Sequence, residues 1–74
     1  MAGNEHLKVR KAIGAHLRHA REEARLTQAE VAEATKLNPN YYARIERGDT
    51  MPALMTLARI LKVLGVKSSE VLPF

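Results

Sequence analysis

The chain has 74 residues, of which 46% are hydrophobic, and this fraction favours one small globular domain over a disordered segment. It has no cysteine, which excludes disulfide bonds and thiolate metal sites and is typical of proteins of the reducing cytoplasm. Twelve Lys and Arg against eight Asp and Glu give a net charge of +4, which favours a polyanionic partner, although excess charge also promotes solubility.

The first predicted element is a helix over about residues 6–24. Apolar residues recur there three or four positions apart, with one longer step across Arg10, while polar residues fill the other faces. The apolar positions are Leu7, Ile13, Leu17, Ala20 and Ala24. No stretch of the chain alternates with a period of two, so the sequence predicts an all-α domain.

Two short helices are expected next, over about residues 28–35 and 39–47. Thr27 begins the first as a capping box, because Glu30 can return a hydrogen bond to its backbone N–H. Asn38 is the expected N-cap of the second, with Pro39 at its first position. Helices this short are unstable alone, so they must pack across each other as a helix-turn-helix over about residues 28–47.

A fourth helix over about 53–64 and a short fifth helix over 69–72 complete the prediction. The fourth has an apolar face at helical spacing and ends at Gly65. That face consists of Leu54, Leu57, Ile60, Leu61 and Leu64. Ser68 is expected to cap the fifth helix. No repeat or linker interrupts the chain, so residues 1–74 are predicted to form a single domain.

The second helix of a helix-turn-helix fits the major groove of DNA, and the outward residues of the helix over 39–47 suit that role. They are Pro39, Asn40, Tyr41, Ala43, Arg44 and Arg47. Apart from Pro39 and Ala43, their side chains can hydrogen-bond to bases or phosphates. The inward positions of the pair are Val31, Leu37, Tyr42 and Ile45.

Four segments together resemble the Xre/Cro family of phage-repressor-like helix-turn-helix regulators. They are IGAHLRHAR, LTQAEVAEATKL, YYARIERG and PALMTLARILKVLGVKSSEVL, and they cover about residues 13–72. The resemblance implies a compact five-helix phage-repressor-like domain and a sequence-specific regulator of transcription that binds double-stranded DNA.

The resemblance also implies which residues contact DNA. Four residues would read base edges: Pro39, Asn40, Tyr41 and Arg44. Of these, Arg44 suits a guanine and Asn40 an adenine, whereas Pro39 offers only apolar contact. Four residues would bind phosphates: Gln28, Asn38, Arg47 and Thr50. Lys36, which stands where relatives carry glycine, is a fifth candidate phosphate ligand. For Lys36, the alternative is a tolerated replacement in the turn.

Arg21 and Glu46 resemble an ion pair that joins the first and third helices in this family. If the pair is partly buried, loss of one partner would cost ~3–5 kcal/mol, because the other charge is stranded. The alternative is two solvated charges that contribute under ~1 kcal/mol.

Some residues depart from the family pattern. Arg25 and Lys36 stand where relatives carry glycine, so a left-handed backbone at either would cost roughly 1 kcal/mol. Ala53 replaces the usual Ser or Thr cap of the fourth helix. Tyr42 is expected to bury its ring while its hydroxyl reaches the surface.

A homodimer on a palindromic operator is the simplest assembly, because one helix-turn-helix reads only ~4–5 base pairs. The expected dimer interface lies near the C-terminal end and consists of Val63, Val71, Leu72 and Phe74. For Phe74, the alternative is that the ring folds back on its own core. Small members of the family include phage Cro-like repressors, controller proteins of restriction-modification systems, and antitoxins, among which the sequence does not choose.

Other classes of function find less support in the sequence. A protein-interaction module, antitoxin-like or anti-repressor-like, is the alternative to a DNA reader. His16 and His19 lack a third ligand nearby, so no metal is expected. No nucleophile set or phosphate-binding glycine loop occurs, so neither an enzyme nor a cofactor or small-molecule ligand is expected. No apolar run approaches the ~18 residues that span a bilayer.

Overall fold

The structure, a computed structural model, describes the backbone of residues 2–74 and the side chains of residues 6–74. It contains four α-helices: α1 (Ala2–Glu23), α2 (Gln28–Thr35), α3 (Pro39–Arg47) and α4 (Leu54–Leu64). A single 3₁₀ turn, η1 (Ser68–Glu70), follows them. The described part of the chain has no strand, which confirms the all-α prediction. Met1, part of the predicted single domain, lies outside the described residues.

The predicted fifth helix over 69–72 is wrong, because the chain makes only the three-residue turn η1 there. Lys67, not Ser68, occupies the N-cap, and its backbone N–H donates to the Glu70 carboxylate. Pro73 follows closely and has no N–H with which to continue a helix. At the other end of the chain, α1 begins at Ala2 and is therefore longer than predicted.

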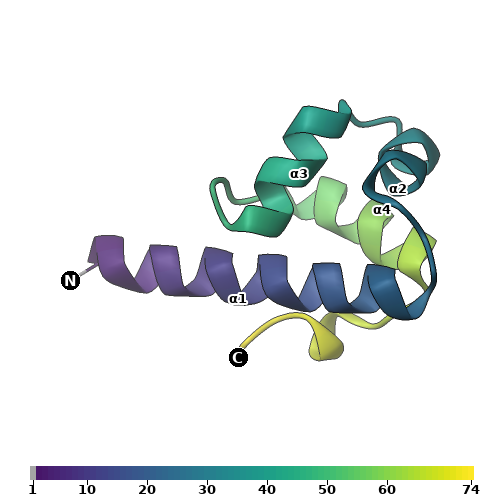
Figure 1. The fold of residues 1–74 in the computed structure, drawn as a ribbon. Helices are drawn as coiled ribbons and strands as arrows, with labels where there is room; N and C mark the ends of the chain where they lie inside the picture. Colours follow the sequence, from purple (N-terminus) through teal and green to yellow (C-terminus); the bar gives the residue numbers. More distant parts are fainter. Residues whose placement is uncertain (1) are drawn as a thin grey trace.

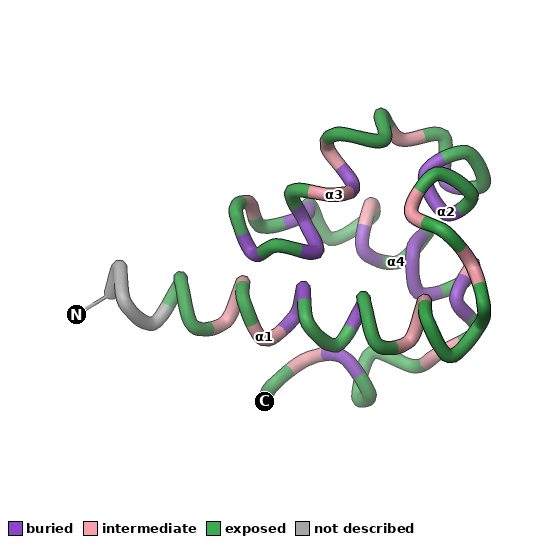
Figure 2. Tube along the Cα trace, viewed as in Figure 1, coloured by how far each residue is buried: buried purple, intermediate pink, exposed green. Residues whose placement is uncertain are grey.

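The helices surround one apolar core (Figure 1). α1 runs the length of the domain, α3 packs on it, and α4 lies behind α3 against α2. The chain after η1 returns along the side of α1 that faces away from α3. Figure 2 shows the buried positions of the four helices facing one another. They include Ile13, Leu17, Val31, Tyr42, Ile45, Leu57, Ile60 and Leu64.

The inward face of α4 is shorter than the sequence indicated. Leu54 has helical spacing to Leu57, yet it is 80% exposed, whereas Leu57 is buried. α4 begins at Leu54, and Ala53 is an N-cap without a side-chain hydrogen bond, as its replacement of Ser or Thr implies. The start of α4 therefore has no side-chain cap, and its first two residues, Leu54 and Met55, lie outside the core.

Gly14 allows α1 and α3 to approach closely. It is buried, and a Cβ there would lie 2.6 Å from the carbonyl oxygen of Ile45 and closer still to that of Glu46. Real Cβ atoms do not come this near to backbone oxygens. The two helices thus meet backbone to backbone at the point where α3 carries Ile45 and Glu46.

The turns on either side of α2 contain two strained residues. Arg25 and Lys36 have φ angles of 59° and 60°, so both adopt the left-handed backbone expected from the glycines that relatives carry there. Gly48 and Gly65 adopt the same conformation without a steric penalty.

Relief of this strain should stabilise the protein. We expect Arg25→Gly and Lys36→Gly each to raise the free energy of unfolding by about 1 kcal/mol, because glycine removes the Cβ clash. That gain corresponds to a rise of about 4–8 °C in Tm, measured by circular dichroism. Ala29→Gly, on the exposed side of α2, is the control and should lower Tm. A loss of stability in both turn variants would contradict the strain argument.

Candidate nucleic-acid interface

The α2–α3 unit is fixed by local hydrogen bonds at each helix end. Thr27 and Glu30 form the predicted capping box at the start of α2. At its end, the N–H of Leu37 donates to the carbonyl of Ala32 at 2.8 Å and closes the turn. The Asn38 side chain then accepts from the backbone N–H groups of Asn40 and Tyr41. These contacts set the direction in which α3 leaves the turn.

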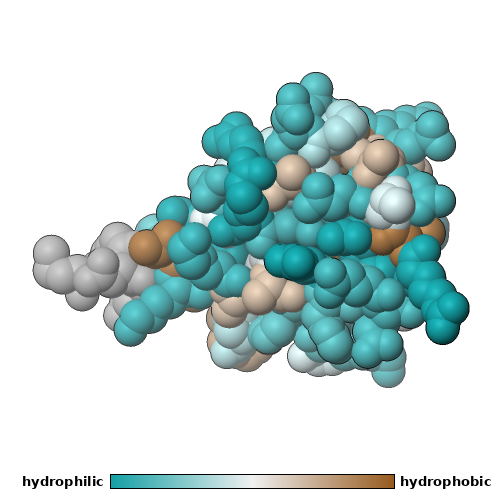
Figure 3. Space-filling view, in the orientation of Figure 1, coloured by the Kyte–Doolittle hydropathy of each residue, from teal (hydrophilic) through white to brown (hydrophobic). Residues whose placement is uncertain are grey.

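The outer face of α3 carries exposed hydrogen-bonding side chains. Pro39, Asn40, Arg44 and Arg47 are exposed, while Tyr41 is half-buried and packs against the core. The one acidic residue of α3, Glu46, is turned inward and buried. In the view of Figure 3, hydrophilic side chains cover most of the face over α3 and the adjoining part of α1. This face of the helix presents amides and cations without a carboxylate.

The residues expected to contact phosphates differ in their exposure and in whether their polar atoms already have a partner. Lys36 and Arg47 are exposed, whereas Gln28 and Thr50 are half-buried. Arg47 pairs with Asp49 at 2.9 Å on the surface. The Asn38 oxygen is occupied by its capping bonds, so only its amide nitrogen can serve a phosphate. All five lie at the ends of α2 and α3 or in the adjoining turns.

An ion pair joins α1 to α3 beneath this face. Arg21 donates to both carboxylate oxygens of Glu46, with Nε–Oε2 at 2.7 Å and Nη2–Oε1 at 3.1 Å. Its third nitrogen, Nη1, donates to the carbonyl of Leu26 at 2.9 Å. The side chains are only 12% and 2% exposed, so the two charges are not freely solvated. This bidentate geometry is the strong form of an ion pair.

Gln28 extends the pair to the first turn of α2. Its Nε2 donates to Glu46 Oε1 at 3.0 Å. The three side chains, together with Arg18 and Arg47, line a polar hollow of about 310 Å³ at the junction of α1, α2 and α3. Gln28 is therefore braced against α3 by the carboxylate that also holds Arg21.

Tyr42 lies next to this network and differs from expectation. Its ring is fully buried, as predicted, but its hydroxyl is buried too and has no hydrogen-bond partner among the described residues. Burial raises the pKa of Tyr42, and the negative charge of Glu46 raises it further. The expectation that the hydroxyl reaches the surface is wrong, because the whole side chain is enclosed, with the hydroxyl near Glu46 and Arg21.

The network makes stability depend on pH. Burial alone would raise the pKa of Glu46, but hydrogen bonds from Arg21 and Gln28 outweigh it and hold that pKa below its ordinary value of 4.5. The folded state thus favours the carboxylate, so this stabilisation is present above pH 4.5 and is lost as pH falls through the lowered folded-state pKa.

We therefore expect wild-type protein to lose stability more steeply than Glu46→Gln below pH 4.5. The measurement is the free energy of unfolding in urea at several pH values between neutrality and acid. Glu22→Gln is the control, because Glu22 forms only an exposed pair with Arg18. Parallel pH profiles for wild type and Glu46→Gln would contradict the pKa direction.

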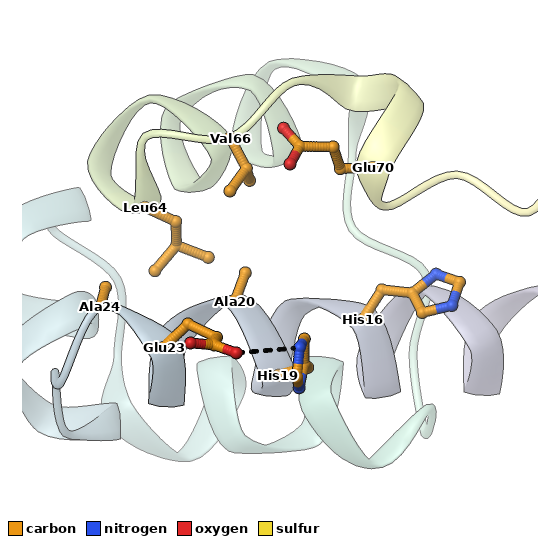
Figure 4. A pocket seen from close by; sticks show the side chains of 8 residues that line it. All are labelled: His16, His19, Ala20, Glu23, Ala24, Leu64, Val66 and Glu70. Atoms are coloured by element: carbon orange, nitrogen blue, oxygen red, sulfur yellow. Dashed lines mark ion pairs between the residues drawn. The ribbon is translucent and has the colours of Figure 1, made fainter.

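A separate hollow of about 470 Å³ lies between α1 and the chain that follows α4 (Figure 4). His16 donates through Nδ1 to the carbonyl oxygen of Val71 at 2.7 Å, and His19 pairs with Glu23 within α1. Within the described residues, no three potential ligands converge on a metal position. The His16–Val71 hydrogen bond ties the C-terminal segment to α1, away from α3.

The residues expected at a dimer interface differ in how exposed they are. Val71 is 1% exposed and belongs to the core, so its placement on an outer surface is wrong. Val63 and Leu72 are half-buried. Phe74 is 86% exposed and does not fold back into the core. Met51, Leu54 and Met55 are also exposed, and of these three only Leu54 was expected on the inward face of α4.

Two short helices joined by a tight turn, with the second exposed along one face, define a helix-turn-helix domain. The pattern of the family described as helix-turn-helix domain matches residues 12–74, and the chain belongs to this family. In the part of the chain that the structure describes, no helix is both long and apolar enough to cross a membrane.

Several known proteins resemble the chain. The immunity repressor protein of Bacillus phage phi105 is 36% identical over 59 residues, which are 80% of this chain and 41% of the repressor. The HTH-type transcriptional regulator y4dJ of Sinorhizobium fredii is 34% identical over 62 residues, which are 84% of this chain and 80% of the regulator. The chain thus spans less than half of the phage repressor but most of the second relative.

A solved structure shows the same fold. The crystal structure of the clp gene regulator ClgR from Corynebacterium glutamicum superposes with a TM-score of 0.82 at 35% sequence identity. The alignment covers 85% of this chain and 67% of the other chain.

Proposed function

We propose that this protein is a sequence-specific regulator of transcription that binds double-stranded DNA through α3. The observation that carries the proposal is the outer face of α3, which presents Asn40, Arg44 and Arg47 while its one carboxylate is turned inward. The printed names of the relatives, an immunity repressor and gene regulators, support the same function. A DNA-binding regulator needs no catalytic centre, and we propose that it acts in the cytoplasm.

The base-reading residues follow from exposure and chemistry. Arg44 projects from the middle of α3 and can donate two parallel hydrogen bonds to a guanine. Asn40 and Pro39 lie one turn earlier, at the end that enters the groove first. Tyr41 is half-buried, so only part of its side chain is available to a base. Arg47, Lys36, Thr50, Asn38 and Gln28 surround them as proposed phosphate ligands.

Arg44 offers the sharpest test of this arrangement. We expect Arg44→Ala to weaken binding to the preferred duplex by about 1–3 kcal/mol and to relax the preference at one base pair per half-site. Arg44→Lys should restore phosphate attraction but not the preference, because an ammonium cannot form the bidentate contact. The measurement is fluorescence anisotropy at fixed salt with duplexes substituted at single positions.

Arg59→Ala provides the control, since Arg59 is exposed on α4 and its loss removes the same charge. If Arg59→Ala and Arg44→Ala weaken binding equally on every duplex, Arg44 does not read a base.

We also propose that the protein acts as a homodimer on a palindromic operator. Two-fold symmetry places two copies of α3 about one helical turn apart, and this doubles the length of sequence read. The exposed apolar side chains of Phe74, Leu54 and Met55 favour contact with another protein, most simply a second copy. A protein-interaction module would also need exposed apolar side chains, and this function is therefore the second candidate.

A further inference from the structure

The N-terminal half of α1 makes two specific contacts with the end of α3. Arg10 Nε donates to the carbonyl of Gly48 at 3.1 Å, and Lys11 Nζ donates to the carbonyl of Arg47 at 3.2 Å. Both residues precede the segment that matches the helix-turn-helix family, which begins at residue 12. Figure 1 shows this part of α1 running beneath the end of α3 and the loop that follows.

These contacts satisfy carbonyl groups that a helix end leaves without partners. The backbone N–H groups of Gly48 and Asp49 return to the carbonyls of Ile45 and Arg44. The carbonyls of Arg47 and Gly48, further along, accept instead from the side chains of Lys11 and Arg10. Cationic donors at a C-terminus also interact favourably with the helix dipole.

The end of α3 packs closely against α1 at Gly48. Gly48 is buried, and a Cβ there would lie 2.7 Å from Lys11 Cγ and 2.8 Å from Lys11 Cα. The end of α3 therefore touches the backbone of α1, and the Lys11 side chain extends past it to the Arg47 carbonyl. Three residues later in α1, Gly14 makes the corresponding close approach to Ile45 and Glu46.

We propose that Arg10 and Lys11 are positioning residues, which clamp the last turn of α3 to α1 and so fix the angle at which Arg44 and Arg47 meet DNA. The consequence for DNA binding rests on the proposed function, whereas the clamp itself does not. Arg10 Nε and Lys11 Nζ donate to carbonyls at the end of α3, and we assign them to these carbonyls rather than to DNA phosphates. The clamp links an N-terminal segment outside the family match to the geometry of the DNA-reading helix.

Three variants of the full chain isolate the clamp: Arg10→Met, Lys11→Met and the double variant. Methionine keeps most of the aliphatic packing of each side chain while removing the donor. Lys8→Met is the matched control. It removes the same charge from the same helix, but Lys8 lines a different hollow with Val9, Ala12 and Phe74. Arg10→Lys tests rescue, because its ammonium can donate to the same carbonyl.

The first readout is amide hydrogen exchange in the absence of DNA. We expect protection of the Gly48 and Asp49 amides to fall about tenfold or more in the double variant, with no change in Lys8→Met and partial recovery in Arg10→Lys. Unchanged exchange in the double variant would overturn the clamp. This readout decides the inference even if the wild-type protein selects no DNA sequence, a result that would instead contradict the proposed function.

The second readout is affinity for the duplex that the wild-type protein prefers and for an unrelated duplex. The loss of two charges alone should weaken binding by twice the effect of Lys8→Met, expressed as a free energy. We expect the double variant to bind the preferred duplex about five- to tenfold more weakly than this baseline. On the unrelated duplex, the affinity of the double variant should depend on salt concentration in the same way as that of Lys8→Met. A salt slope reduced by about two units on both duplexes would show that Arg10 and Lys11 bind phosphates, and it would overturn their assignment as positioning residues.

Discussion

Replacement of Gly14 by alanine is expected to destabilise the protein by about 2–3 kcal/mol or more, which lowers Tm by about 10–20 °C. In an ordinary helix interior the same change stabilises by about 1 kcal/mol, so the predicted effect has the opposite sign. The reason is geometric: the new methyl group would overlap the carbonyl oxygens of Glu46 and Ile45. These are backbone atoms, which cannot move aside as a flexible side chain can.

Relief of the overlap requires α3 to move away from α1. Such a shift would stretch the Arg21–Glu46 pair, which has an Nε–Oε2 distance of 2.7 Å. We therefore expect Gly14→Ala to lose specific DNA binding even at temperatures where it remains folded. Urea unfolding monitored by circular dichroism measures the first effect, and fluorescence anisotropy with the preferred duplex measures the second.

Gly65→Ala is the matched control for this experiment. Gly65 has a φ of 72°, but a Cβ there would meet no atom within 4 Å. Its replacement should cost only the left-handed backbone penalty of roughly 1 kcal/mol and leave DNA binding intact. If Gly14→Ala were as stable as wild type, the close packing of α1 on α3 would be disproved.

Loss of Arg21 should produce the second large effect. Arg21→Met removes three hydrogen bonds and leaves the Glu46 carboxylate, only 2% exposed, without its cation. We expect a cost of about 3–5 kcal/mol, since a stranded buried charge loses solvation without compensation. For a domain of this size that is a large fraction of a total stability of about 5–15 kcal/mol.

A double-mutant cycle separates the pair from its surroundings. If the cost arises from a stranded charge, Arg21→Met/Glu46→Met should be more stable than Arg21→Met alone. Arg18→Met is the control, because Arg18 pairs with Glu22 on the surface with side chains 65% and 53% exposed. That change should cost under about 1 kcal/mol. Additive effects of Arg21→Met and Glu46→Met would show that the two charges do not interact.

Local signals in the sequence predicted the helix ends well. Thr27, Asn38 and Gly65 each occupy the cap expected of them, because a cap depends on a few neighbouring backbone groups. The left-handed backbone at Arg25 and Lys36 was also predictable, because members of the similar family usually carry glycine at these positions. The helix-turn-helix and its outward residues followed from these boundaries.

Features set by tertiary placement were not predictable from the sequence. Leu54 and Val71 have similar hydropathy, yet one is exposed and the other belongs to the core. In the sequence, Arg10 and Lys11 are simply two cationic residues of one helix. Their contacts with the carbonyls of Gly48 and Arg47 depend on where α3 ends in the fold. The burial of the Tyr42 hydroxyl likewise depends on the residues that enclose it. Spacing along a helix gives the face of a residue but not what covers it.

The most direct test of the proposed function is selection of bound sequences from a random duplex pool with purified protein at fixed salt. We predict enrichment of a palindromic consensus with half-sites centred about one helical turn apart, as two symmetric copies of α3 require. Loss of the preference at one position per half-site in Arg44→Ala would then assign that contact. A folded helical protein that enriches no sequence would contradict a sequence-specific DNA reader and would direct the search to a protein partner.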